Sequence, residues 1–296
     1  MKVLENRTRM EIKNVLFPTD FSPAADGAIP YVSEIVRRFG ARLYALYVRP
    51  PVINPMTEPA SWPALERAAM AEAKAQRQSL LEAFLGIKPE VMIEEGDFWQ
   101  ILKSIIEQQR IDLIVLGTRG RSGAAKFFLG SKAEEIFREA PCAVLTIGPY
   151  SHTKPQRGEF TEILYATDFS PSSAGAVAYA ISLAQEFQAH LTLLHVIADE
   201  KAGDLVHAAE LTGSAERLLR RFVSPEAEIW CEPHFAVERG PAAEKILEVA
   251  KQKKADLIVL GVRQPSGFPG AATHLPIAIA HQVVSRAECP VLTVRG

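Results

Sequence analysis

The sequence predicts an α/β protein made of two tandem, doubly wound domains, each with a five-stranded parallel sheet. Three segments return in the same order: NVLFPTDFSP (14–23) as EILYATDFSP (162–171), IDLIVLGTRGRSG (111–123) as ADLIVLGVRQPSG (255–267), and PCAVLTIG (141–148) as ECPVLTVR (288–295). The offsets are 148, 144 and 147 residues, which indicates duplication of one domain. Within each half, short apolar runs alternate with helical segments, the pattern of a parallel sheet with right-handed crossovers.

The chain has 296 residues, enough for two domains of ordinary size. We therefore expect one domain over residues 1–150 and a second over 151–296. Between the repeats lies GPYSHTKPQRGEF (148–160), which is polar and contains Gly, Pro and Ser, so it is interpreted as a linker.

The first half begins with a strand and a helix. The apolar run NVLFPT (14–19) predicts a buried strand. Ser22 and Pro23 have the form of a helix cap followed by a first-turn proline, and the helix should run to about Phe39, where Gly40 ends it.

The remaining elements of the first half follow in the same alternation. They are expected as a strand at 42–48, a long helix from about 63 to 85, a strand at 90–95, a helix opened by Gly96–Asp97, a strand at 112–117, a helix at 132–140 and a strand at 142–148. The strands are almost continuously apolar, which fits burial on both faces of a parallel sheet.

The carboxyl ends of the strands are where a doubly wound sheet binds ligands, at the point where the strand order reverses. Thr19 and Asp20 follow the first strand, and Gly117 ends the fourth. These positions are therefore the first candidates for a site.

The loop GTRGRSGAAKFFLGS (117–131) has the composition of an anion cradle. Gly117, Gly120 and Gly123 can turn several backbone N–H groups toward one point. Gly130 and Ser131 stand where the next helix begins, and its free N–H groups and positive dipole end favour phosphate. The loop predicts a phosphate-bearing ligand held mainly by backbone.

A purely structural interpretation of this loop is also open. The glycines can serve only a tight turn, with Ser131 only a helix cap. However, about 13 residues is long for a strand-to-helix connection, which usually takes roughly 2–6. Arg119 and Arg121 also add positive charge. These features favour a binding role.

The spacing Gly117-x2-Gly120-x9-Gly130-Ser131, with PTDFS at 18–22 and APCAVLTI at 140–147, resembles the universal stress protein family. The resemblance covers both halves and hence essentially the whole chain, as in a tandem family member. It implies an adenine nucleotide α-hydrolase-like fold with flavodoxin-like layering. It further implies an ATP-binding first domain, since this glycine pattern marks the family members that bind ATP.

The resemblance also implies which residues meet the nucleotide. The glycines and Ser131 are expected to contact the ribose and phosphates, and Asp20 and the backbone near Val48 are expected beside the adenine. The resemblance leaves open whether Mg²⁺ binds together with the ATP. Asp20 has an alternative role, orienting the turn before Ser22. The expected nucleotide-binding residues are Pro18, Thr19, Asp20, Val48, Gly117, Arg119, Gly120, Gly130 and Ser131, of which Pro18 and Thr19 mainly shape the turn.

The second copy keeps the strand and loses the cradle. Asp168 matches Asp20, and Gly261 matches Gly117. Counted from the strand, the other cradle positions hold Gln264, His274 and Leu275; counted back from the cysteine, Ile277 and Ala278 replace the glycine–serine pair. We therefore expect weak or no nucleotide binding in the second half.

Composition and motifs exclude several functions. The net charge of −2 and pI near 6.4 argue against nucleic acid, no apolar run is long enough to cross a membrane, and the three scattered cysteines fit neither disulfides nor zinc. A cytoplasmic protein is expected. His195 can enter the second cleft or simply pack on its strand. We expect no metal site, and no P-loop or catalytic set marks an enzyme, so slow ATP hydrolysis is the most that is expected.

Two functions remain in view. The first is an ATP-binding stress-response regulator that forms a homodimer of tandem chains and acts on a protein partner the sequence does not identify. The alternative is a non-catalytic scaffold whose two domains pair through their last strands, with any nucleotide incidental. An electron-transfer or nucleotidyl-transfer enzyme rests on analogy of fold alone.

Overall fold

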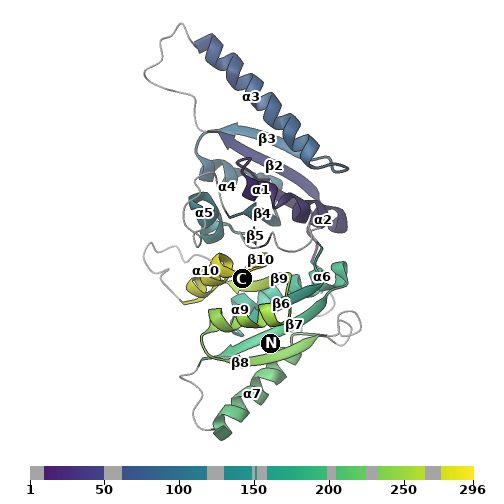
Figure 1. Cartoon of the computed structure of the whole chain (residues 1–296), viewed down its shortest axis with the longest axis vertical. Coiled ribbons are helices and arrows are strands. Elements are labelled where there is room, and N and C mark those ends of the chain that lie inside the picture. The colour runs from purple at the N-terminus through teal and green to yellow at the C-terminus, as the bar shows by residue number, and fades with distance from the viewer. Residues whose placement is uncertain are drawn as a thin grey trace.

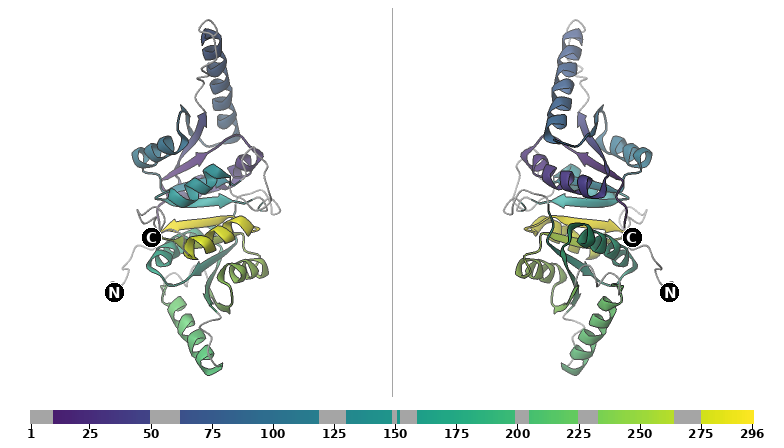
Figure 2. Two further views of the ribbon diagram at one scale, coloured as in Figure 1. Left: turned by 90° about the vertical axis from the view of Figure 1, so that its left-hand side faces the viewer. Right: turned by 90° about the vertical axis from the view of Figure 1, so that its right-hand side faces the viewer.

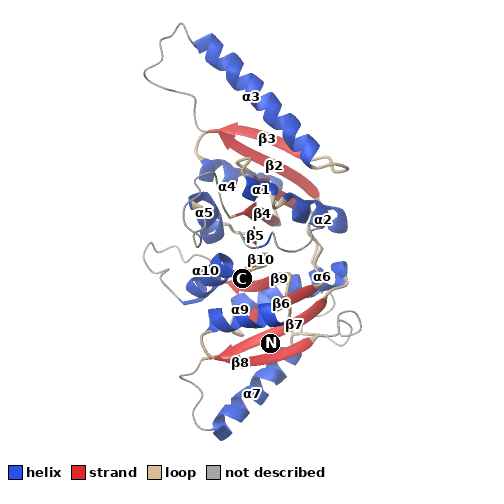
Figure 3. Ribbon diagram, in the orientation of Figure 1, coloured by secondary structure: helices blue, strands red, loops and turns tan. Residues whose placement is uncertain are grey.

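The computed structural model describes residues 10–49, 62–118, 130–148, 151, 159–198, 205–224, 233–263 and 275–296, with backbone alone for 62–66, 205–208 and 275–278. The strands are β1 (Asn14–Pro18), β2 (Arg42–Arg49), β3 (Glu90–Glu95), β4 (Leu113–Gly117), β5 (Ala143–Ile147), β6 (Glu162–Thr167), β7 (His190–Ile197), β8 (His234–Arg239), β9 (Leu257–Val262) and β10 (Val291–Arg295). The helices are α1 (Pro23–Asp26), α2 (Ile29–Phe39), α3 (Trp62–Ala83), α4 (Phe98–Gln109), α5 (Ser131–Glu139), α6 (Pro171–Phe187), α7 (Leu205–Arg220), α9 (Ala242–Gln252) and α10 (Leu275–Arg286) (Figure 1, Figure 3).

The strands form one ten-stranded sheet in the order β3-β2-β1-β4-β5-β10-β9-β6-β7-β8. Each half is a parallel five-stranded sheet whose order reverses between its first and fourth strands, so the predicted doubly wound α/β class is confirmed. Figure 2 shows β5 and β10 side by side and pointing in opposite directions. Leu145 pairs with Leu292 at the middle of this antiparallel junction. The two copies therefore pair through their last strands.

The sheet separates two hydrophobic cores, because successive strand side chains point to opposite faces. Val15 and Phe17 of β1 enter the core under α1, α2, α3, α6 and α7, whereas Leu16 enters the core under α4, α5, α9 and α10. Each core contains residues from both halves of the chain. The junction between β5 and β10 is therefore packed on both faces.

The first predicted helix is divided into two. The prediction of one helix from Ser22 to Phe39 was wrong in this respect, since α1 ends at Asp26 and α2 begins at Ile29. Pro30 lies in the first turn of α2 and has no N–H, so it cannot donate to the carbonyl of the preceding turn. The predicted end is confirmed, because Gly40 has a φ of 62° and caps α2.

An aromatic contact joins the halves beside α2 and α6. The Tyr31 ring stacks on Phe160 at 5.9 Å, and Phe160 lies 4.9 Å from Phe187. The guanidinium of Arg38 lies 5.0 Å over the Phe187 ring and donates to the Glu186 carbonyl at 2.9 Å. Side chains on this face therefore reinforce the junction of the strands.

No helix in the described part of the chain has the length and apolar character needed to cross a bilayer. Within the same residues, no His, Cys, Asp and Glu side chains gather as a metal would require.

Candidate functional site

The turn after β1 is held by its own side chains. The Oγ1 atom of Thr19 accepts from the N–H of Phe21 at 3.0 Å, and Oδ1 of Asp20 accepts from the N–H of Ser22 at 3.0 Å. Ser22 in turn caps α1 by accepting from the N–H of Ala25 at 3.3 Å. Phe21 has a φ of 56°, a left-handed conformation that these two hydrogen bonds help to hold.

The second copy repeats this turn. The N–H of Phe169 donates to Thr167 at 3.0 Å, the N–H of Ser170 donates to Oδ1 of Asp168 at 2.9 Å, and Phe169 has a φ of 60°. The turn-orienting role considered for Asp20 is therefore a property of both halves. Asp20 also lines a cavity, so its second carboxylate oxygen can serve a ligand as well.

The charge of Asp168 stabilises its turn. Partial burial of the carboxylate opposes ionisation, but hydrogen bonds from Ser170, Ser173 and the backbone outweigh this and lower the pKa of Asp168 below its usual 3.8. A carboxyl group with a lowered folded-state pKa contributes stability above its unfolded-state pKa. It loses that contribution as the pH falls through the folded-state value.

We predict that Asp168→Asn lowers the free energy of unfolding at pH 7, by less than about 1 kcal/mol because the side chain is solvent-screened. The asparagine keeps the acceptor oxygen and removes only the charge. In urea titrations at pH 7, 5, 4 and 3, the difference from the unmodified protein should be greatest at pH 7 and 5 and should shrink as the pH falls below 3.8. Glu216→Gln on the exposed face of α7 is the control. A difference that stays constant with pH would contradict the role of the charge.

The fourth strand leads to the start of α5. Thr118 is anchored by its N–H and its hydroxyl, which donate to the Ile147 carbonyl at 3.1 and 3.2 Å. The N–H of Gly130 donates to the Thr118 carbonyl at 2.9 Å, which brings the beginning of α5 back to the end of β4. Gly130 is the N-cap of α5 and supplies no side-chain cap. The first N–H groups of a helix have no partner within it, so this helix end is suited to an anion.

These elements enclose a cavity of about 310 Å³ at the carboxyl edge of the first half. Seven of the nine predicted residues lie together around it, namely Pro18, Thr19, Asp20, Val48, Gly117, Gly130 and Ser131. The other two, Arg119 and Gly120, lie outside the described residues. The size is within the range of roughly 300–1,000 Å³ usual for small-molecule sites.

Seven further lining residues were not predicted from the sequence, and Phe98, Thr118 and Lys132 are the aromatic and polar ones among them. The ammonium of Lys132 lies 4.6 Å from the centroid of the Phe98 ring, a cation–π contact at the pocket. Two signals were available in the sequence. Lys132 directly follows Ser131, and Phe98 follows the third strand at the same edge of the sheet.

Gly117 has a packing role that is independent of any ligand. A Cβ on this residue would lie well inside contact distance of the Ala24 carbonyl and 3.0 Å from the Ala25 nitrogen. In the second half, a Cβ on Gly261 would lie 2.5 Å from the Ser172 carbonyl oxygen. Both glycines therefore admit the first helix of their half, and the identity of Gly117 alone does not indicate a nucleotide.

The equivalent cavity in the second half is smaller, about 80 Å³, compared with about 310 Å³. Its walls are also less polar. Thr118 lines the first cavity, whereas Val262, its counterpart after the glycine that ends the apolar run, does not line the second. The pocket residues Phe98 and Lys132 are replaced by Ala242 and Ile279.

The helix before the last strand is also longer in the second half. Counted back from the last strand, Ala278 stands where Ser131 begins α5, yet α10 already begins at Leu275. Regular helix thus replaces the glycine–serine start. Among the described residues of the second half, the positions that match Gly130 and Ser131 lie inside α10 and not at its start.

Of the two placements considered for His195, the structure shows packing on the strand, because His195 does not line the second cavity. Its Nδ1 lies 2.8 Å from the Thr167 carbonyl, and its ring packs 4.3 Å from Phe169. The first half has the same arrangement with Tyr47 at 5.1 Å from Phe21. His195 is thus a packing residue on the other face of the sheet. His274 lies outside the described residues.

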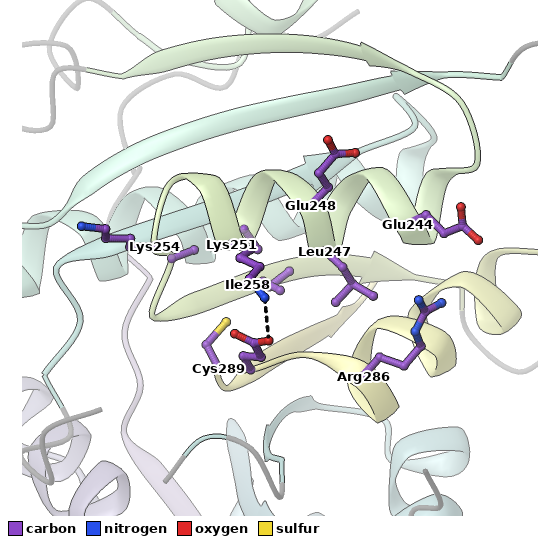
Figure 4. Close-up of a pocket in the computed structure, with 11 residues that line it drawn as sticks. Glu244, Leu247, Glu248, Lys251, Lys254, Ile258, Arg286 and Cys289 are labelled. Atoms are coloured by element: carbon purple, nitrogen blue, oxygen red, sulfur yellow. Dashed lines mark hydrogen bonds and ion pairs between the residues drawn. The ribbon is translucent and has the colours of Figure 1, made fainter. Parts of the chain in front are cut away.

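A larger cavity of about 510 Å³ lies between α9 and the turn before β10 (Figure 4). Ile258 and Cys289 on its floor stand at the amino ends of β9 and β10, so it faces the edge of the sheet opposite the switch point. Lys251 and Glu288 close part of its rim with an ion pair of 3.4 Å. Its position does not match the predicted site.

The cysteines before the last strands are packing residues. Cys289 is buried, and Cys142 is half-buried, with burial raising the pKa of its thiol to about 12. A thiol with so high a pKa is protonated at neutral pH and is a poor nucleophile.

Fold and site together define a tandem α/β protein whose halves share one sheet and whose first half carries a ligand-sized pocket at its switch point. The chain belongs to the universal stress protein family, whose family model matches residues 11–148 and 159–295. A universal stress protein of Mycolicibacterium smegmatis is 24% identical over 302 residues, covering 95% of this chain and 96% of the relative. Another, from Synechocystis sp., is 26% identical over 311 residues, covering 96% and 100%.

A solved structure has the same fold over the whole chain. The universal stress protein of Archaeoglobus fulgidus superposes with a TM-score of 0.70 at 21% identity, covering 97% of this chain and 99% of that one. Together with the two family matches, this shows a tandem family member.

Proposed function

We propose that this chain is a nucleotide-binding regulatory protein of the stress response, acting in the cytoplasm, whose first domain holds ATP. The observation that carries the proposal is the pocket of about 310 Å³ at the start of α5, whose N-cap Gly130 supplies no side-chain cap. The reduced cavity of the second half supports assigning the ligand to the first half alone.

The pocket offers suitable chemistry for each part of the nucleotide. The amino end of α5 suits phosphate through its N–H groups and dipole, and Lys132 adds a positive charge at the same helix end. Val48 and Phe98 give apolar wall to a planar base, and Asp20 gives a carboxylate acceptor. A Mg²⁺ ion would be held chiefly by the phosphates, as is usual for this cation.

We propose binding rather than catalysis. The polar groups nearest the switch point have structural partners: Thr118 donates to the Ile147 carbonyl, and Asp20 accepts from the turn after β1. Any ATP hydrolysis in this pocket is expected to be slow. Occupancy would instead order the pocket and change a surface that a protein partner reads, in a homodimer of tandem chains.

The stoichiometry of binding tests this assignment. Isothermal titration with ATP is expected to give one nucleotide per chain, and mass spectrometry should detect an adenine nucleotide released from gently purified protein. Parallel titrations with AMP and cyclic AMP identify the preferred form. Two equal sites per chain would contradict the loss of the second pocket, and no binding of any of the three would contradict the function itself.

The continuous sheet favours a second candidate, a scaffold in which nucleotide is incidental. Its observation is the antiparallel pairing of β5 with β10 between two packed cores. Hydrogen exchange with and without ATP distinguishes the two. A regulator should change exchange outside the pocket, whereas a scaffold should change it only at the residues that line the pocket.

A further inference from the structure

A side chain of the second domain is attached to the pocket helix of the first. Arg295 ends β10, and its Nη2 and Nε donate to the carbonyls of Phe137 at 2.5 Å and Ala140 at 3.2 Å, which close the carboxyl end of α5. Its Nη1 donates to the carbonyl of Arg263, just after β9, at 2.7 Å. The guanidinium therefore joins α5 to the second half of the sheet.

This attachment suits the end of a helix. The last carbonyls of α5 lack partners within the helix and form its negative dipole end, so a cation is favoured there. Burial lowers the pKa of Arg295, whereas Glu139 and Cys142 raise it. The guanidinium stays charged at any physiological pH. Its rigid fork of N–H groups can bind three carbonyls at once.

The same helix forms the pocket at its other end. Ser131, Lys132, Ala133 and Ile136 line the cavity, and the Phe137 carbonyl that Arg295 binds follows directly. A helix of nine residues moves as one body, so its carboxyl end controls where its amino end lies.

Among the residues that the structure describes, no arginine is attached in this way to the carboxyl end of α10. The pseudo-twofold relation of β5 and β10 places Gly148 where Arg295 stands. A Cβ on Gly148 would lie 3.5 Å from the Ala287 carbonyl oxygen and 3.9 Å from that of Val284. These carbonyls are the counterparts of Ala140 and Phe137, so the geometry is repeated without the guanidinium. The helix that is held is the one whose half has the larger pocket.

We propose that Arg295 is a positioning residue for the first-domain pocket, and that the second domain serves this pocket by holding α5 in place. The inference rests on the proposed nucleotide function only in one respect, the predicted effect of Arg295 on ATP affinity. The restraint of α5 is a property of the free protein and can be measured separately.

The test compares Arg295→Met and Arg295→Lys with the unmodified full chain. Methionine keeps much of the aliphatic stem and removes the hydrogen bonds, whereas lysine keeps the charge without the fork. Arg286→Met is the matched control, since it removes one positive charge from an exposed site on α10 that lies outside the contacts to α5. Isothermal titration gives the ATP affinity, and hydrogen exchange of the ligand-free proteins reports on α5 and α10.

We expect Arg295→Met to weaken ATP binding roughly three- to tenfold, which lies within the range for residues that act on a site without touching the ligand. Amide exchange should become faster in α5 and stay unchanged in α10. Arg295→Lys should show the same direction, because an ammonium cannot bridge three carbonyls with the geometry of the fork. Arg286→Met should change neither the ATP affinity nor the exchange of α5, because any effect of the lost charge is confined to α10, whose last turn Arg286 ends.

Two results would overturn the inference. One is unchanged affinity and unchanged α5 exchange in folded Arg295→Met; the other is equal acceleration in α5 and α10, which would show general loosening of the sheet. If the unmodified protein binds no ATP, the proposed function fails, and the exchange of α5 relative to α10 still decides the role of Arg295. If the methionine variant does not fold, the lysine variant decides it.

Discussion

Replacing Gly117 with alanine is expected to lower the free energy of unfolding by about 3 kcal/mol, the upper range for an overpacked core. The added Cβ would press against the Ala24 carbonyl, a backbone group that cannot turn aside as a side chain can. The expected measurement is a shift of the urea midpoint with no change in its slope.

Gly261→Ala should have a similar effect, since its Cβ would lie 2.5 Å from the Ser172 carbonyl oxygen and 2.7 Å from the Ser173 nitrogen. The control is Gly213→Ala in α7, where the nearest atom to the new Cβ is a guanidinium nitrogen of Arg217 at 3.5 Å. That change should be neutral or stabilising by up to about 1 kcal/mol, because alanine favours helix over glycine. A stable Gly261→Ala protein would show that the two glycines have different roles.

Replacing Gly130 with valine is expected to weaken ATP binding at least roughly a hundredfold, equivalent to about 2.7 kcal/mol. Gly130 has a φ of −58° and a ψ of 149°, which valine can adopt, so the chain should still fold. The isopropyl group would stand on a residue that lines the pocket, at the helix end where we place the phosphates. Isothermal titration measures the loss, and a thermal melt shows whether the fold is retained.

Two further variants make this result specific. Ser131→Ala removes only a hydroxyl and should weaken binding less than the valine does, because the backbone N–H groups remain. Ala83→Val places the same valine at an exposed position of α3 and should leave the affinity unchanged. Undiminished ATP binding by Gly130→Val would place the nucleotide elsewhere.

The sequence was sufficient for the fold because its signals are local and occur twice. The repeated TDFSP segments form the same turn in both halves, in which threonine, aspartate and serine side chains accept hydrogen bonds from the same backbone N–H groups. Asp97 was predicted to open a helix and accepts from the Gln100 N–H at 2.9 Å as the cap of α4. The break between α1 and α2 was also foreseeable, since Pro30 cannot donate within a continuous helix.

The site was predictable where its residues lie at strand ends or carry the spacing of the glycine-rich loop. Edge positions such as Thr19 and Gly117 could be placed by the rule for doubly wound sheets, whereas Phe98 and Lys132 meet only after α4 and α5 have packed. The sequence pattern also could not distinguish a glycine required for packing from a glycine required for ligand binding. Gly117 and Gly120 look alike in one loop, but the approach of α1 that requires Gly117 is visible only in three dimensions.

The antiparallel junction of β5 with β10 has a consequence for how the two halves can diverge. In a homodimer of single domains, one gene encodes both partners, so any change in one pocket is imposed on the other. Fusion removes that constraint. The first half has Gly130 at its helix start and Gly148 at the position of the arginine, whereas the second half has Ile277 at the position of Gly130 and Arg295 at the end of its last strand. The halves thus become an unequal pair in a fixed one-to-one ratio, and neither can be exchanged for a second copy of itself.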